Sequence, residues 1–301
     1  GDGWLDPSEA THLQGANVQR GLVYSPTNNQ LYLVDRNAGT FVRALDGTSG
    51  ALVGSLNTTG VTGGTFAANM VGVGGDGAIY VANLSTANTS EFKVYRWENV
   101  AAAPTVAYNG LTGLVRTGDT FAVMGNGAAT RIVASGSGAN GIAVLGTADG
   151  SNFTLTSANP IAGAAAGAFR LGMDFIDPNT VIGKSSGTTI QTADLVNSTS
   201  QTSAVTSASE APLAYYSPLN LLATVDYTSN LVRLYDATIF ANLTLLDTQT
   251  TTTGAVVSNG NGVGDLSFGV GPDGALRLYV LNTNNGIQAF RVVDAVPEPT
   301  S

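Results

Sequence analysis

A motif that recurs along the chain constrains the fold more than any other feature. Residues 21–26, Gly-Leu-Val-Tyr-Ser-Pro, are similar to residues 213–218, Leu-Ala-Tyr-Tyr-Ser-Pro, and residues 71–77 are similar to residues 268–274. Each copy is an apolar run that enters a tight turn, and a second apolar run follows it. Six such second runs align, and their central residues lie about 49 positions apart, at Tyr32, Tyr80, Ile132, Ile182, Ala223 and Tyr279. A period of about 40 to 50 residues is typical of propeller blades.

The flanking pattern supports four strands in each unit. A third alternating run occurs in all six units, at 40–45, 92–97, 141–145, 189–193, 231–235 and 287–292. A fourth run occurs in the first five units, at 52–56, 104–108, 153–157, 203–206 and 243–248. The sixth unit lacks a fourth run, because the eight residues after Val293 contain two prolines, which cannot donate to a sheet ladder. Residues around 10–14 could supply the missing strand, or could pair with a neighbouring molecule instead.

The sequence therefore predicts an all-β fold, a six-bladed β-propeller of four-stranded antiparallel blades. The propeller spans residues 21–294, preceded by an N-terminal segment, 1–20, and followed by a tail, 295–301. Seven blades or a β-solenoid remain as alternatives.

Composition excludes several classes of protein. The chain has 301 residues, 43% of them hydrophobic and only 11% charged, which is not the composition of a disordered chain. It contains no cysteine, so disulfides and thiolate metal sites are excluded. With a net charge of −9, two lysines and scattered arginines, we expect no nucleic acid partner. The most apolar run, 161–169, is too short for a membrane helix, so no membrane span is expected.

The C-terminal residues suggest export. Val296, Pro297, Glu298 and Pro299, followed by Thr-Ser, resemble the start of the PEP-CTERM sorting signal of bacterial exosortase substrates. The resemblance covers six residues, and the apolar helix and basic cluster that follow the motif in that family are absent here. It implies a secreted or cell-surface bacterial protein. A chain that starts without Met and ends at this motif is also what processing at both ends would leave.

Candidate catalytic residues are sparse, and we predict no enzyme activity. His12 is the only histidine, and it lies in the N-terminal segment, so a histidine-based triad or metal site is not expected. Asp followed by Gly or Pro occurs five times and could supply Ca²⁺ ligands, but turn formation explains each pair equally well: Asp46, Asp76, Asp149, Asp177 and Asp273. We therefore expect no cofactor, with Ca²⁺ as the alternative.

Two further sets of residues are candidates for function. Lactonase-like and phytase-like propellers hold a metal where inner strands meet the channel, and Asp119, Asp174 and Asp265 lie on or at the start of such strands. Asn-x-Ser/Thr sequons, which are candidate glycosylation sites, occur at Asn57, Asn83, Asn88, Asn152, Asn197 and Asn242.

Three functions remain open on this basis. The first is a structural protein that self-assembles, through its two terminal segments, into an extracellular filament, surface layer or biofilm matrix. The second is a binding module for polysaccharide or a protein partner, with Trp4, Trp97, Tyr215 and Tyr216 as candidate aromatic platforms. The third is a metal-dependent propeller hydrolase.

Overall fold

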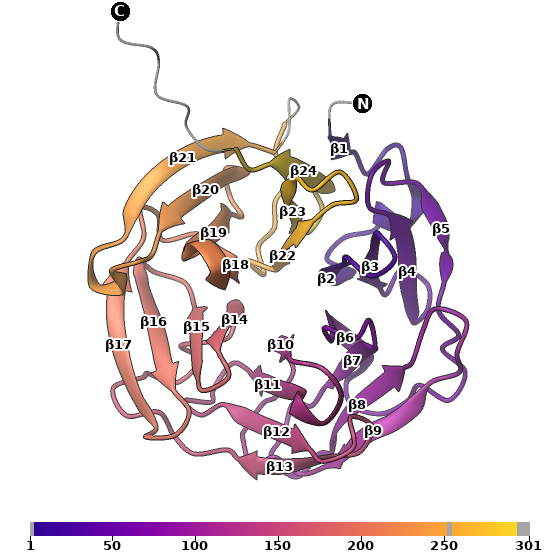
Figure 1. Cartoon of the computed structure of the whole chain (residues 1–301), viewed down its shortest axis with the longest axis vertical. Coiled ribbons are helices and arrows are strands. Elements are labelled where there is room, and N and C mark those ends of the chain that lie inside the picture. The colour runs from indigo at the N-terminus through magenta and orange to yellow at the C-terminus, as the bar shows by residue number, and fades with distance from the viewer. Residues whose placement is uncertain (1–2, 252–254, 294–301) are drawn as a thin grey trace, which may run out of the picture.

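The computed structural model describes residues 3–251 and 255–293, and these form a six-bladed β-propeller around a central channel (Figure 1). Every blade is a four-stranded antiparallel sheet, and in the first five blades the strands follow one another outward in chain order. The predicted fold class and number of blades are confirmed. In the described residues, no helix is both long and apolar enough to cross a membrane.

The strands of the first three blades have the following bounds: β2 (Gln19–Ser25), β3 (Gln30–Asp35), β4 (Phe41–Asp46) and β5 (Leu52–Ser55); β6 (Phe66–Val73), β7 (Ile79–Leu84), β8 (Phe92–Trp97) and β9 (Thr105–Gly110); β10 (Thr120–Met124), β11 (Arg131–Ser135), β12 (Ala143–Thr147) and β13 (Phe153–Ser157).

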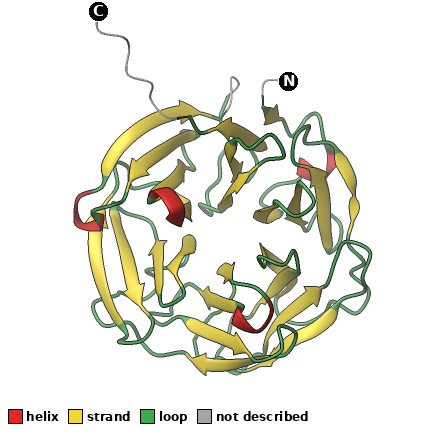
Figure 2. Cartoon of the chain, in the orientation of Figure 1, coloured by secondary structure: helices red, strands yellow, loops and turns green. Residues whose placement is uncertain are grey.

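Blades four and five continue the same order, and the sixth takes its last strand from the N-terminus: β14 (Gly172–Asp177), β15 (Thr180–Lys184), β16 (Thr189–Asp194) and β17 (Thr199–Ala204); β18 (Glu210–Tyr216), β19 (Leu221–Asp226), β20 (Leu231–Asp236) and β21 (Thr244–Thr250); β22 (Gly264–Val270), β23 (Leu276–Asn282), β24 (Ile287–Arg291) and β1 (Trp4–Leu5). Short 3₁₀ helices interrupt some connections (Figure 2), at Thr11–Leu13, Gly127–Ala129, Ser217–Leu219 and Phe240–Asn242.

The N-terminal segment closes the ring, but through a different strand from the one predicted. Trp4 pairs with Gln288 and Leu5 with Ile287, so β1 forms the outer edge of blade six in the same chain. The prediction that residues 10–14 form this strand is wrong, because they contain a 3₁₀ helix. There Ala10 and Leu13 are buried in an apolar cluster with residues of blades one and six, which stabilises a compact turn rather than an extended strand.

Two other strands begin two or more residues away from their predicted starts. In blade four the outer strand begins at Thr199 rather than at 203, because Asp194 accepts hydrogen bonds from the amides of Val196 and Asn197 and tightens the turn before it. That strand is polar and mostly exposed, so no hydrophobic alternation marks its start. In blade three β12 begins at Ala143, since Gly141 instead forms an isolated bridge with Pro160.

The core consists of apolar clusters, most of which bridge neighbouring blades. One contains Tyr80 of blade two and Ile132 of blade three, with Phe153 against Tyr80 at a ring separation of 5.6 Å. All six residues that define the sequence period have at most 1% of their surface exposed. Burial of these side chains provides the main stabilisation of a chain that has no disulfides.

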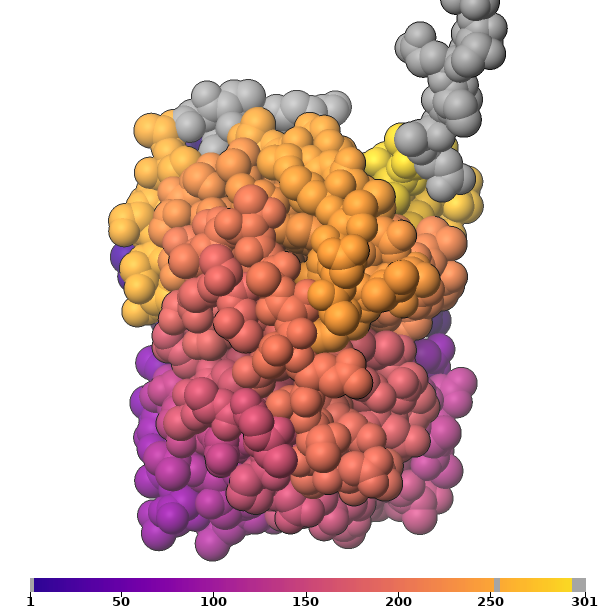
Figure 3. Space-filling view, turned by 90° about the vertical axis from the view of Figure 1, so that its left-hand side faces the viewer, coloured from indigo at the N-terminus to yellow at the C-terminus, as the bar shows by residue number. Residues whose placement is uncertain are grey.

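Inner strands of adjacent blades approach one another closely. A Cβ atom on Gly21 would lie 2.5 Å from the amide nitrogen of Val71, and one on Gly172 would overlap the carbonyl oxygen of Ala211. Glycine is required at these positions for the inner strands to pack around a narrow channel. The side view in Figure 3 shows the rim that blades four and five present to solvent, coloured pink to orange.

Candidate functional site

A polar cavity lies at the end of the channel where the inner strands begin. Its volume is about 250 Å³, and its lining comes from five of the six blades: Arg20, Asn69, Arg116, Asp119, Ser137, Arg170, Leu171, Asn261, Val263 and Gly264. Arg20 belongs to β2, while Arg116 and Arg170 lie four and two residues before the first residues of β10 and β14. We call this cavity, with Arg20, Arg116 and Arg170 around it, the arginine mouth.

One of the three arginines already has a carboxylate partner. Arg116 donates from Nε to Asp119 Oδ2 at 2.7 Å and from Nη2 to Asp119 Oδ1 at 2.8 Å. The amide of Ser137 also donates to Asp119 Oδ2, at 2.8 Å, and holds the carboxylate in place. The hydrogen bonds to Asp119 raise the pKa of Arg116. Arg116 and Asp119 therefore form a fixed and electrically neutral pair at one side of the mouth.

Arg20 has no such partner. Within residues 3–251 and 255–293, its side chain makes no hydrogen bond or ion pair, and its Nε is buried. Burial lowers the pKa of Arg20, and its charge interactions with Asp119 and Arg116 have opposite signs. A guanidinium stays protonated at neutral pH, so Arg20 presents an uncompensated positive charge to the cavity.

Two further arginines add to this charge. Arg36 donates from Nη1 to the side-chain oxygen of Asn69 at 2.9 Å and from Nη2 to the carbonyl of Asn17 at 3.2 Å. Both partners are neutral, so its charge is not balanced by a carboxylate of the described residues. Burial, and then the charge of Arg20, lowers the pKa of Arg36 to about 9. Arg170 donates from Nε to the hydroxyl of Ser185 at 3.0 Å, which is a neutral partner. The mouth therefore holds a surplus of positive charge, and it can bind an anion.

Asp174 and Asp265 lie deeper, in a second cavity of about 210 Å³ that the six inner strands line. Asp265 accepts hydrogen bonds from the amides of Leu22, at 2.9 Å, and Leu266. Asp174 accepts from the amides of Tyr215, at 2.8 Å, and Phe175. Burial raises the pKa of Asp174 to about 6, and burial also raises the pKa of Asp265 well above its usual value.

The three predicted carboxylates therefore do not form one site. Asp119 is paired with Arg116 at the mouth, whereas Asp174 and Asp265 line the channel and link adjacent blades through backbone amides. Across the described ranges, no three His, Asp or Glu side chains gather in an arrangement that could hold a metal ion. The carboxylates of Asp46 and Asp149 accept hydrogen bonds from the amides two and three residues further on, as expected of turn formers.

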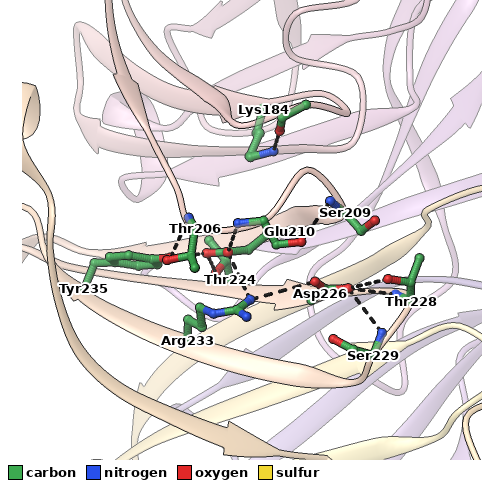
Figure 4. Close-up of polar contacts among 12 residues, drawn as sticks. Lys184, Thr206, Ser209, Glu210, Thr224, Asp226, Thr228, Ser229, Arg233 and Tyr235 are labelled. Atoms are coloured by element: carbon green, nitrogen blue, oxygen red, sulfur yellow. Dashed lines mark hydrogen bonds and ion pairs between the residues drawn. The ribbon is translucent and has the colours of Figure 1, made fainter.

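A second polar cluster lies between blades four and five (Figure 4). Glu210, which is fully buried, accepts hydrogen bonds from Arg233 at 3.0 Å, from the Thr224 hydroxyl at 2.6 Å and from the Tyr235 hydroxyl at 2.6 Å. Lys184 is also fully buried, and its ammonium group donates to the backbone carbonyls of Ser185 and Gly187. Neither Glu210 nor Lys184 lines the channel cavities. We therefore interpret this cluster as structural.

Other residues singled out in the sequence have structural positions. His12 is 7% exposed, in the 3₁₀ helix of the N-terminal segment, and away from both channel cavities. Trp97 is fully buried and donates to the carbonyl of Asn57, so its proposed role as an exposed platform is wrong. Trp4 donates to the carbonyl of Asn285 beside the closing strand. Tyr215 and Tyr216 line the channel cavity.

The sequons differ in accessibility. Asn83 has no exposed surface, its Nδ2 donates to the carbonyl of Glu91, and its Oδ1 accepts from the amide of Lys93. A glycan on Asn83 is incompatible with this packing. The remaining five are exposed, and their glycosylation stays a prediction: Asn57, Asn88, Asn152, Asn197 and Asn242. The proposed sorting motif, Val296 to Pro299, lies outside the described residues.

The sequence analysis missed the arginine mouth. Its arginines come from separate units of the repeat and look scattered along the chain. A signal was nevertheless present, because Arg20, Arg116 and Arg170 all lie at or just before the first strand of a unit. Propeller topology brings these strand starts together around one end of the channel.

Comparison with known proteins supports the fold. A family model described as a domain of unknown function, DUF4623, matches residues 47–166, which contain the last strand of blade one and all strands of blades two and three. No curated protein matches the chain. A crystal structure of a DUF4623 family protein from Bacteroides eggerthii is similar with a TM-score of 0.69 and 17% identity, covering 96% of this chain and 74% of that one.

Two other solved structures are similar at lower levels. A gluconolactonase from Xanthomonas campestris has a TM-score of 0.58 and 12% identity, covering 93% of this chain and 88% of its own. A chain of a nidogen/laminin complex has a TM-score of 0.55 and 12% identity, covering 78% of this chain and 81% of its own. At these identities the likeness extends to the fold alone, so what the chain does has to be argued from its own residues.

Proposed function

We propose that this protein is a binding module whose arginine mouth holds a small anionic ligand. The observation that supports this most directly is Arg20, a half-buried guanidinium that faces a polar cavity without a partner in the described residues. Removing a charge from water is costly unless a partner compensates for it, so an unpaired cation at this position favours a bound anion.

The charge distribution of the molecule strengthens this argument. The chain has a net charge of −9, yet three arginines and a single carboxylate line the mouth. A local positive potential on an acidic protein attracts small anions while the rest of the surface repels large polyanions. The proposal thus agrees with the expectation that nucleic acid is not the partner.

The size of the cavity limits the ligand. A volume of about 250 Å³ falls just below the usual range of about 300 to 1,000 Å³ for small-molecule sites. One small molecule, or one terminal residue of a longer chain, would fill it. This is a form of the polysaccharide-binding hypothesis in which charged side chains, rather than exposed aromatic rings, make the contacts.

The other two hypotheses have less support from the described residues. The gluconolactonase of similar fold is an enzyme by its name, but Asp119, Asp174 and Asp265 here are divided between two cavities. For self-assembly, the N-terminal strand that was proposed as a connector pairs within its own chain. Export to the cell surface and assembly therefore stay predictions that rest on the sequence.

The test is thermal stabilisation by anions. We expect millimolar sulfate, phosphate or acetate to raise the Tm relative to sodium chloride of equal ionic strength, since a ligand that binds only the folded state stabilises it. Arg20→Gln should abolish most of this shift. Arg291→Gln changes an exposed arginine at the end of β24, remote from the cavity lining, and should leave it intact. Equal shifts in all three proteins would refute the proposal.

A further inference from the structure

We infer that the ligand of the arginine mouth is a hydroxylated monocarboxylate, such as a sugar acid, rather than a phosphate or sulfate ester. This inference rests on the proposed function and specifies the chemistry of its ligand. It follows from which charged and hydrogen-bonding groups of the mouth already have partners within the protein and which do not.

The pair formed by Arg116 and Asp119 shows which anion suits this site. Its two hydrogen bonds, of 2.7 and 2.8 Å, place a planar carboxylate against one edge of a guanidinium. Arg20 lines the same cavity and has the same planar set of N–H donors, but no carboxylate within the described residues binds to them. A ligand carboxylate at Arg20 would reproduce the interaction that Asp119 makes with Arg116.

Asp119 also disfavours a doubly charged ligand. The pair with Arg116 is neutral overall, but the carboxylate oxygens line the cavity and repel an anion at short range. This repulsion grows with the charge of that anion. Arg20 is the lining guanidinium without a hydrogen-bond partner in the described residues, since Arg116 pairs with Asp119 and Arg170 donates to Ser185. A monocarboxylate satisfies Arg20 with less repulsion from Asp119 than a phosphate dianion would meet.

The rest of the lining suits hydroxyl groups. Ser137 and Asn261 each bring a polar side chain to the cavity, and neither side chain has a hydrogen-bond partner within the described part of the chain. Arg170 has two terminal nitrogens beyond the Nε that binds Ser185. The apolar contribution comes from Leu171 and Val263, with no aromatic ring in the lining. A ligand with several hydroxyls around one carboxylate can use these groups together.

Isothermal titration with four probes tests the inference: D-glucuronate, D-glucose, D-glucose 6-phosphate and sodium sulfate. We expect glucuronate to bind at least about tenfold more tightly than the other three, because glucose has no charge to pair with Arg20 and the more highly charged anions meet more repulsion from Asp119. Arg20→Gln should remove this preference, and Asn261→Ala should weaken glucuronate binding.

The outcomes separate the two proposals. If glucose 6-phosphate or sulfate binds as tightly as glucuronate and Arg20→Gln abolishes that binding, the mouth is an anion site but the monocarboxylate inference is wrong. If none of the anions binds, or Arg20→Gln has no effect on binding, the proposed function itself fails. Circular dichroism spectra and Tm values of each variant establish that it folds, and Arg291→Gln is the matched arginine control.

Discussion

At the scale of single residues, ionisation of the buried ammonium group of Lys184 makes the stability of the fold depend on pH in the alkaline range. Lys184 is fully buried, and it donates at 3.0 Å to the carbonyl of Ser185. Burial lowers its pKa to about 8, although the charges of Glu210 and Asp226 partly oppose this shift. In the unfolded chain the pKa of a lysine is about 10.4. Between the folded and unfolded pKa values, the unfolded state therefore binds more protons than the folded state does.

We therefore predict that the free energy of unfolding rises by about 1 to 3 kcal/mol as the pH increases from 8 toward 10. Urea denaturation at pH 7.5, 8.5 and 9.5 measures this rise. Lys184→Met should lack it, whereas Lys93→Met, which changes the other lysine, should retain it. Measurements stop near pH 10, because burial raises the pKa of Tyr235 and Tyr279 and their ionisation opposes folding at higher pH. An unchanged slope in Lys184→Met would contradict the assignment.

Asp174 predicts the opposite pH dependence in the acidic range. Burial raises its folded pKa to about 6, above the value of about 3.9 in an unfolded chain. Its contribution to stability is therefore fully present below pH 4 and is lost as the pH rises through 6. We expect Asp174→Asn to gain stability relative to the unmodified protein as the pH rises from 4 to 7, by on the order of 1 kcal/mol. Denaturant titrations at four pH values should show this, and Asp247→Asn, at an exposed position, should show no such trend.

At the scale of the strand and blade, one polar position recurs in every unit. The residue three positions after the centre of each second strand is polar: Asp35, Asn83, Ser135, Ser185, Asp226 and Asn282. In blade one Asp35 forms an ion pair with Arg43 at 3.0 Å, and in blade five Asp226 lies 3.9 Å from Arg233. The residues that pair with these aspartates from the first strand are Gln19 and Glu210. The two blades therefore place an Asp and an Arg at equivalent positions, but the nearest carboxylate to the arginine is Asp35 in blade one and Glu210 in blade five.

This correspondence predicts how blade five tolerates substitution. Glu210→Ala should destabilise the protein by about 3 to 5 kcal/mol, because it leaves the buried guanidinium of Arg233 without its nearest partner. Glu210→Gln should cost less, about 1 to 2 kcal/mol, since it keeps a hydrogen-bond acceptor and reproduces the residue found in blade one. Thermal and urea denaturation of both variants, with Gln19→Glu as the reciprocal change, measures the difference. Equal losses in the two variants would show that the charge of Glu210, not its hydrogen bonding, is essential.

The burial of each strand determines whether it could be located from the sequence. The second strands could be located because apolar residues such as Tyr32, Tyr80 and Tyr279 repeat at a regular distance and are buried. The outer strand of blade four could not be located in this way, because Thr199 to Ala204 is polar and mostly exposed and shows no alternation of apolar and polar residues. The arginine mouth could not either, since Arg20, Arg116 and Arg170 become neighbours only when strands of three blades meet at the channel.

At the scale of the whole molecule, closure of the ring depends on a very short strand. β1 contributes only Trp4 and Leu5 to the edge of blade six, next to β24. Leu5 packs on the cluster that includes Leu31 and Ile287, and so links blade six to blade one. Gly286, at a φ of +87°, leaves room for the carbonyl of Leu5, which a side chain there would contact. The sequence alone left open whether this segment pairs within its chain or with a neighbour, because both arrangements cover the same edge.

The absence of cysteine from the chain allows a direct test of closure. Trp4 and Gln288 face each other in register across β1 and β24, so a Trp4→Cys, Gln288→Cys variant can form a disulfide between these strands and no other. We expect oxidation to give a cross-linked monomer that migrates faster than its reduced form on a non-reducing gel. The bridge would join nearly the whole chain into one loop, so the Tm should rise by several degrees. The single variants, Trp4→Cys and Gln288→Cys, control for chance collisions between molecules. Covalent dimers or longer ladders in the double variant alone, at micromolar protein, would show that the strand is exchanged between molecules, as a self-assembling subunit requires.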